Sequence, residues 1–128
     1  PPRSTPLYSS AASDVYKRQD ITCTTGLSAN EDLTSTSEKI RKNGEQKLLE
    51  SINIASIMGS KILTGVIHCS WGVSDAKGSN KEIKFINSAN SLKNIGSHLE
   101  KNNIRLGIEP LNRYETDFTC TAGKIIDL

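Results

Sequence analysis

Three short apolar segments, rich in β-branched residues, alternate along the chain with longer segments of helical period. The short segments are residues 21–25, 62–68 and 104–109, and the last two are bounded by Gly, Ser or Asn. Runs of this length and composition are typical of buried strands. The sequence therefore predicts three strands, beginning near residues 21, 62 and 104, which is a repeat of about 41–42 residues.

The segment between the first two strands predicts an amphipathic helix. Its apolar positions share one face of the helix: Ile40, Leu48, Ile52 and Ala55. Charged residues lie on the other faces: Lys39, Lys42, Glu45 and Glu50. Ser35–Glu38 has the spacing of a capping box, in which Glu38 returns a hydrogen bond to the cap amide. Gly59 is placed to end the helix.

A second helix is predicted between the second and third strands, from apolar residues repeating at three and four: Ile83, Ile86, Ala89, Leu92, Ile95 and Leu99. Asn102 and Asn103 then supply a turn, and residues 121–128 open another helix. Helical crossovers between strands imply an α/β fold with a parallel sheet. A doubly wound sheet and a (β/α)₈ barrel both satisfy this pattern.

Residues 1–19 differ in character from the rest of the chain. They hold three of the four prolines and have no hydrophobic period. Residues 9–19, SSAASDVYKRQ, resemble the translation of a transposon-based sequencing adaptor, so we expect a non-native, unstructured arm. Of the 16 basic and 14 acidic residues, this arm contains Arg3, Lys17, Arg18 and Asp14, which leaves 13 of each in residues 20–128. This balance argues against nucleic acid or an anionic membrane as a partner.

The remaining composition narrows the class of protein further. No run approaches the ~18 apolar residues of a membrane-spanning helix. The three cysteines, Cys23, Cys69 and Cys120, are odd in number and lack the spacing of zinc sites. Reduced cysteines indicate a cytoplasmic protein.

Glu109 is the first candidate for chemistry, because it ends an apolar strand and is followed by Pro110. Sites in parallel α/β folds lie at the carboxyl ends of the strands, where the loops 26–34 and 69–80 also begin. A carboxylate there requires a metal, a raised pKa or a basic partner. A plain ion pair with a residue such as Arg113 is the competing interpretation.

The run that contains Glu109, Ile108–Thr116 (IEPLNRYET), resembles the signature of the ketose 3-epimerases, the tagatose/psicose 3-epimerase group of the xylose-isomerase-like TIM barrels. Residues 22–26, the stretch 35–44, and residues 65–68 followed by Trp71 resemble earlier parts of the same family. The resemblance covers residues 20–128. It implies a partial (β/α)₈ barrel of about three βα units, running from the family's second strand to the start of its fourth helix.

The resemblance also implies roles for individual residues. Glu109 would bind a metal and be one of two glutamates that move a proton at C3 of a ketose. Glu115 would hydrogen-bond substrate hydroxyls, and Trp71 would wall the pocket. Gly26 and His68 are further candidates to lie beside the substrate, and a hydrogen-bonded structural histidine is an equal interpretation of His68. Asn112 and Arg113 would hold the loop in place.

The implied reaction is metal-dependent C3 epimerisation of a free ketose through a cis-enediolate, with Mn²⁺, Co²⁺ or Mg²⁺ as the ion. The family's other ligands lie beyond Leu128, so the fragment itself is expected to be inactive, and the full-length protein to be a homo-oligomer. The alternatives are an aldose–ketose isomerase, a hydroxypyruvate-type isomerase of the same superfamily, and a non-catalytic sugar-binding barrel.

Overall fold

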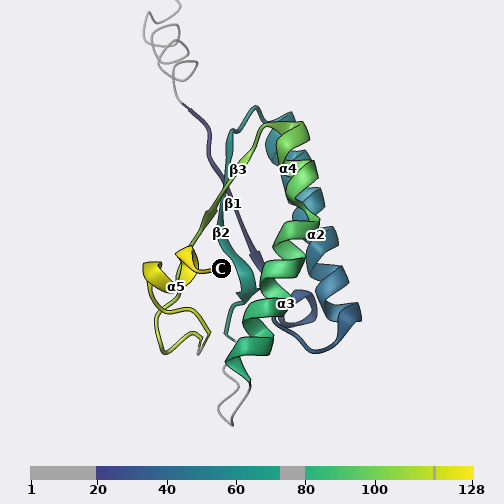
Figure 1. Cartoon of the computed structure of the whole chain (residues 1–128). Helices are drawn as coiled ribbons and strands as arrows, with labels where there is room; N and C mark the ends of the chain where they lie inside the picture. The colour runs from purple at the N-terminus through teal and green to yellow at the C-terminus, as the bar shows by residue number, and fades with distance from the viewer. Residues whose placement is uncertain (1–19, 73–79, 117) are drawn as a thin grey trace, which may run out of the picture.

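The computed structural model describes residues 20–72, 80–116 and 118–128. The expected adaptor-derived arm (1–19) and most of the loop 69–80 lie outside these residues. Three strands form one parallel sheet in the order β1-β2-β3 (Figure 1): β1 (Cys23–Leu27), β2 (Ile62–Ser70) and β3 (Arg105–Ile108). The helices are α2 (Glu38–Ile57), α3 (Lys81–Asn94), α4 (Gly96–Asn102) and α5 (Ala122–Ile126), with a 3₁₀ turn, η1 (Ala29–Glu31).

All three predicted strands are present, so the predicted α/β fold with a parallel sheet is confirmed. Their limits differ by one or two residues from the predicted ones. The first strand runs to Leu27 and the second to Ser70, each two residues further along the chain than predicted. Gly26 and His68 therefore lie within strands rather than after or at the end of them.

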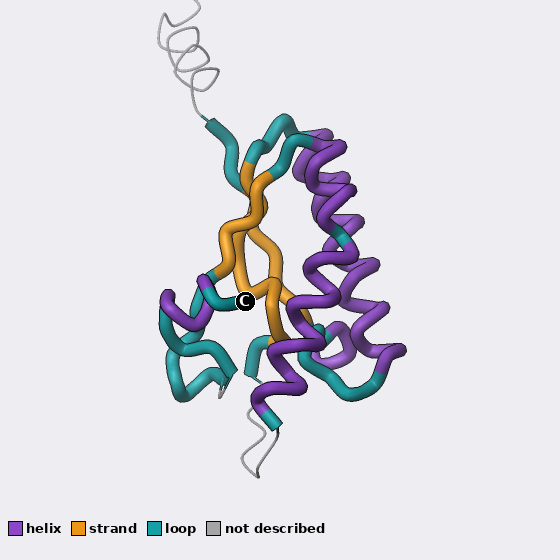
Figure 2. The backbone as a smooth tube through the Cα atoms, in the orientation of Figure 1, coloured by secondary structure: helices purple, strands orange, loops and turns teal. Residues whose placement is uncertain are grey.

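The helices α2, α3 and α4 lie on one face of the sheet, and the core lies between these two layers (Figure 2). Alternate strand residues point toward this core, which is why β2 contributes Leu63 and Ile67 and β1 contributes Leu27. The buried cluster is Leu27, Leu33, Leu48, Ile52, Ala55, Leu63, Ile67, Ile95 and Ile104. The predicted apolar face of α2 supplies three of these residues.

The opposite face, which we call the helix-free face, carries the other half of the strand residues. Parallel register places Thr24 beside Thr64, and Thr64 beside Gly107. One step further along, Gly26 lies beside Val66. This face is therefore lined by small, mainly polar or half-exposed residues rather than by a second apolar core.

The start of α2 differs from the prediction, whereas its end matches. Ser37 caps the helix without a side-chain hydrogen bond, so the predicted capping box over 35–38 is wrong. The Ser35 hydroxyl instead accepts from the amide of Ser37 (3.1 Å), a local alternative that competes with capping. Gly59, with φ of +76°, follows the helix as predicted.

The predicted second helix is two helices, α3 and α4, which meet at Ile95. The predicted apolar face is also partly wrong, because Ile83 and Ile86 are 44% and 50% exposed. The buried positions are Ser88, Ser91 and Ile95. The Ser88 hydroxyl donates to the carbonyl oxygen of His68 (2.6 Å), so small polar residues bring α3 close to β2 and turn the isoleucines outward.

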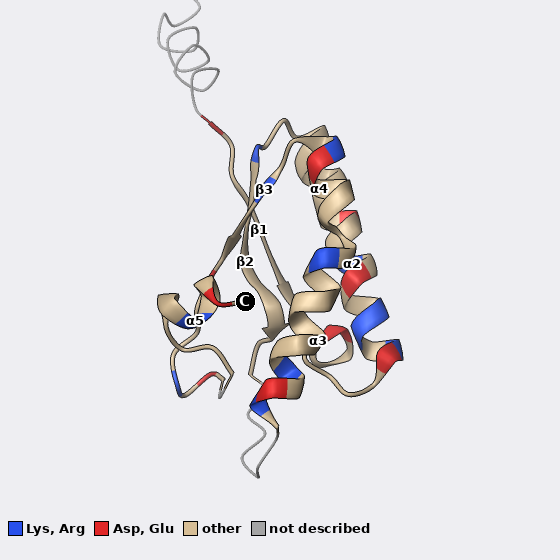
Figure 3. Cartoon of the chain, viewed as in Figure 1, with Lys and Arg blue, Asp and Glu red and all other residues tan. Residues whose placement is uncertain are grey.

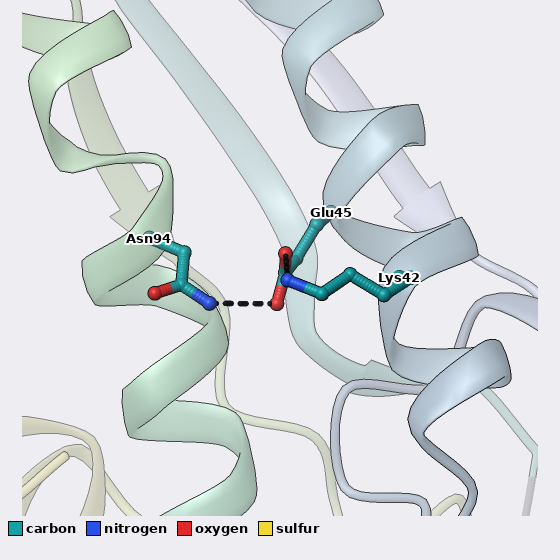
Figure 4. A network of polar contacts seen from close by, with 3 residues as sticks. All are labelled: Lys42, Glu45 and Asn94. Carbon is teal, nitrogen blue, oxygen red and sulfur yellow. Dashed lines mark hydrogen bonds and ion pairs between the residues drawn. The ribbon is translucent and has the colours of Figure 1, made fainter.

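A polar network joins α2 to α3 (Figure 4). Glu45 is buried on α2, and its carboxylate accepts from Lys42 Nζ (2.7 Å) and from Asn94 Nδ2 (3.0 Å). Burial acts to raise the pKa of Glu45, but these hydrogen bonds outweigh it, and the net pKa lies below the usual value of 4.5. The two helices are therefore aligned by directional contacts as well as by packing.

Charged residues of both signs are interspersed over α2, α3 and α4 (Figure 3). This matches the equal numbers of basic and acidic residues over 20–128. Within the described ranges, no helix has both the length and the apolar character needed to cross a bilayer.

Candidate active site

The candidate site lies at the carboxyl ends of the strands. The amide of Glu109 donates to the carbonyl oxygen of Gly65 (3.0 Å), which continues the β3 ladder by one residue, and Pro110 has no N–H with which to extend it. The Glu109 side chain is exposed. Among the described residues it has no hydrogen-bond or ion-pair partner.

The competing ion pair between Glu109 and Arg113 is not formed. The guanidinium carbon of Arg113 instead lies 5.8 Å from the centroid of the Tyr114 ring. In the part of the chain that the structure describes, the one salt bridge is Lys42–Glu45, far along the sequence from this edge. The Glu109 carboxylate is therefore available to a ligand.

Three predicted site residues come together: Trp71, Asn112 and Glu115. The indole Nε1 of Trp71 donates to Glu115 Oε1 (3.3 Å), and Asn112 Nδ2 donates to Glu115 Oε2 (2.5 Å). Both carboxylate oxygens are thus oriented while keeping free lone pairs. Glu115 is placed to accept further hydrogen bonds, as recognition of sugar hydroxyls requires.

Local turn chemistry explains how Asn112 holds this segment. Its side-chain oxygen accepts from the amide of Tyr114 (2.8 Å), and its carbonyl oxygen accepts from the amides of Glu115 (3.0 Å) and Thr116 (3.2 Å). An asparagine that bonds the backbone two residues ahead stabilises a turn. Asn112 thus stabilises this turn through its own hydrogen bonds, and Arg113 contacts Tyr114. That either residue supports a substrate site stays a prediction.

His68 is fully buried within β2, two residues before the strand ends at Ser70. Its Nε2 shares a hydrogen bond with Thr119 Oγ1, and its ring stacks on Phe118 with centroids 5.9 Å apart. Burial lowers the pKa of His68 to about 4, although the charge of Asp32 acts in the opposite direction, so the imidazole is neutral near pH 7. A direct contact of His68 with substrate stays a prediction.

Gly26 borders open space on the helix-free face. A Cβ built at this position would meet no atom within 4 Å. The pairing of β1 with β2 also shifts directly after it, from Gly26–Val66 to Leu27–Ser70. The strand pairing is therefore irregular directly after Gly26, and a role for Gly26 next to a substrate stays a prediction.

Asp32 and Thr119 are two residues of this region that sequence reasoning missed. Asp32 Oδ1 accepts from the amide of Ser70 (3.1 Å) and from the amide of Thr34 (3.0 Å), so it ties the loop after β1 to the end of β2. The Asp-Leu-Thr spacing of residues 32–34 is a local turn signal that could have indicated Asp32. No sequence signal indicates the long-range contact of Thr119.

The residues present can supply part of a metal site. No group of three or more His, Cys, Asp or Glu that could hold a metal ion lies within residues 20–72, 80–116 and 118–128. At the carboxyl end of β3, Glu109 offers an exposed oxygen donor that has no partner among the described residues, which suits a hard divalent cation. The donor type fits such an ion, but further ligands are needed.

A parallel sheet with helices on one face and polar side chains gathered at its carboxyl edge is the architecture of an α/β barrel sector. The family model of the xylose isomerase-like TIM barrel matches residues 4–128. The chain therefore belongs to the xylose isomerase-like TIM barrel family.

Individual relatives confirm the resemblance to ketose 3-epimerases. The chain is 30% identical over 97 residues to an L-ribulose 3-epimerase of Methylomonas sp. (strain DH-1), covering 76% of this chain and 33% of that relative. The crystal structure of a D-allulose 3-epimerase from Methylomonas sp. in complex with D-allulose superposes with a TM-score of 0.74 at 28% identity, covering 81% of this chain and 35% of that one.

A D-psicose 3-epimerase from Clostridium cellulolyticum H10, solved with D-tagatose, has the same fold, with a TM-score of 0.79 at 22% identity over 91% of this chain and 40% of that one. The chain thus spans about a third of the length of the relatives it matches first, and the predicted partial barrel is confirmed.

Proposed function

We propose that these residues form one sector of a longer barrel that epimerises a free ketose at C3 and depends on a divalent metal ion. The observation that carries the proposal is the exposed carboxylate of Glu109, unpaired among the described residues at the end of β3. The 3-epimerases among its relatives, one of them solved with D-allulose, support a ketose as the substrate class.

In this proposal Glu109 binds the metal ion and takes a proton from C3. A bound Mn²⁺, Co²⁺ or Mg²⁺ ion supplies positive charge that stabilises the developing enediolate. Glu115 accepts hydrogen bonds from sugar hydroxyls while Trp71 and Asn112 hold its two oxygens in place. The exposed face of the Trp71 indole packs against the sugar ring and excludes water from it.

Epimerisation also needs a second acid/base on the other side of the carbon, because one carboxylate cannot return the proton to the opposite face. The proposal therefore requires a second carboxylate and further metal ligands in the rest of the barrel. Homo-oligomerisation and a cytoplasmic location stay predictions.

The test is exchange of the C3 hydrogen of a ketose with solvent deuterium, measured by NMR on the full-length protein. Glu109→Gln removes the base and should lower the exchange rate by roughly 10²–10⁴-fold. The matched control is Glu100→Gln, an exposed carboxylate on α4, which should leave the rate unchanged. Exchange at the wild-type rate in Glu109→Gln would contradict the proposed role.

The same experiment separates two of the alternatives from the proposed epimerase. An aldose–ketose isomerase would exchange hydrogen at C1 or C2 and convert the ketose to an aldose. A sugar-binding barrel would bind a ketose without exchanging any carbon-bound hydrogen.

A further inference from the structure

Two contacts join the carboxyl end of β2 to the segment that follows β3. One is exposed, between Trp71 Nε1 and Glu115 Oε1. The other is buried, between His68 Nε2 and Thr119 Oγ1, and both of these side chains are 0% exposed. Trp71 follows His68 by three residues and Glu115 precedes Thr119 by four, so both contacts connect the same two segments.

We propose that His68 and Thr119 are positioning residues, whose buried hydrogen bond holds the segment after β3 where Glu115 meets the indole of Trp71. The relevance of this contact to sugar binding rests on the proposed function. The geometry itself is a property of the chain without sugar.

His68 is itself held rigidly in the fold, so a hydrogen bond to it can hold the segment after β3 in place. Its carbonyl oxygen accepts from the Ser88 hydroxyl of α3 (2.6 Å), and its peptide group lies within the central strand of the sheet. Phe118 stacks on the imidazole with an interplanar angle of 26°, and Cys69 Sγ lies 3.5 Å from Nε2. The backbone of His68 is therefore held by the helix layer and the sheet, and its ring is held by the attached segment.

Packing alone does not account for an imidazole at this position. Among the described residues, His68 Nδ1 is buried without a hydrogen-bond partner, and a buried unpaired polar atom is destabilising. A phenylalanine would fill a similar volume without that penalty. What the imidazole provides and phenylalanine lacks is a directional bond to Thr119.

The exposed contact is too weak to order the segment by itself. Trp71 is 61% exposed, and its 3.3 Å hydrogen bond to Glu115 competes with water. Asn112 orients Glu115 only from within the same loop, so it does not fix that loop relative to β2. The buried bond between His68 and Thr119 supplies this constraint.

The test uses the fact that Trp71 is the single tryptophan among these 128 residues. The ¹⁵N–¹H correlation spectrum of this 128-residue chain therefore contains one indole peak. Glu115→Ala defines the peak position when the contact is absent. Thr119→Val removes the hydroxyl with little change of shape, and we expect it to move the indole peak most of the way to that position. Thr119→Ser keeps the hydroxyl and should leave the peak close to its wild-type position.

His68→Phe provides a second, independent variant and should move the indole peak in the same direction. The matched control is His98→Phe, because His98 bonds Asn53 at the surface and touches neither segment. Dispersed backbone amide peaks in the same spectra show that each variant is folded.

An indole peak that stays at its wild-type position in folded Thr119→Val or His68→Phe would overturn the proposal. So would a Thr119→Ser shift as large as that of Thr119→Val. Loss of amide dispersion in either variant would show a structural role and would also overturn it. Because no sugar is present, failure here leaves the epimerase proposal standing, and failure of the deuterium-exchange test leaves this result standing.

Discussion

Ile67 lies fully buried beneath the helices, whereas Val66, the residue before it on β2, is half-buried on the helix-free face. The same alternation separates Leu63 from Thr64. One face of the sheet packs against three helices, and the other presents threonines, glycines and, at the end of β3, Glu109. Residues that stabilise this sector and residues available for chemistry are therefore neighbours in sequence but separated by the sheet.

The largest expected effect tests this separation directly. Ile67→Ala removes a fully buried side chain and should lower the free energy of unfolding by about 2–5 kcal/mol. Val66→Ala is the matched control on the other face and should lower it by at most about 1 kcal/mol. Urea denaturation followed by circular dichroism measures both values. Equal losses would show that the helix-free face carries a core of its own.

A second effect depends on pH and arises from His68, whose pKa is lowered to about 4 by burial. Between pH 6.5 and 4 the unfolded chain binds a proton at this residue and the folded chain does not. The contribution of His68 to the free energy of unfolding is therefore fully present above pH 6.5. It is lost as the pH falls toward 4, by at most about 3 kcal/mol.

Thermal midpoints measured at several pH values check this slope. His68→Phe should flatten it, and His98→Phe, at the surface, should retain it. An unchanged slope in His68→Phe would mean that other groups cause the acid sensitivity.

The smallest of the three effects compares two glycines of the paired strands β1 and β2. Gly65 has φ of +123°, and a Cβ there would overlap the carbonyl oxygen of Thr25, so Gly65→Ala should cost about 1–3 kcal/mol. Gly26→Ala introduces a methyl group into open space and should change stability by less than about 0.5 kcal/mol. The midpoints of urea denaturation measure both effects. A large loss of stability in Gly26→Ala would contradict the open space seen beside Gly26.

The strand positions could be predicted because short β-branched segments recur at a constant spacing, and the end of α2 because Gly59 adopts a conformation that glycine favours. The exposure of Ile83 and Ile86 could not be predicted, since a helical period does not say which neighbour will cover a face. The close approach of α3 depends on the Ser88–His68 hydrogen bond, which exists only in the folded chain.

At the candidate site, the structure brings together Glu115, Asn112 and Trp71, three residues that the family resemblance singled out. Their roles toward a sugar stay predictions. The contacts of Asp32 with Ser70 and of His68 with Thr119 join residues 38 and 51 positions apart. Such pairs follow from the three-dimensional arrangement of the strand ends rather than from any local pattern.

Gly44, on the outer layer, has a consequence for the site as well. A Cβ at Gly44 would overlap the carbonyl oxygen of Glu31 and the side chain of Leu33, so the loop after β1 rests directly on the backbone of α2. Any larger residue there would push the loop that carries Asp32 outward and pull on Ser70. The absence of a side chain at Gly44 on α2 therefore determines how closely the Asp32 loop approaches the carboxyl end of β2.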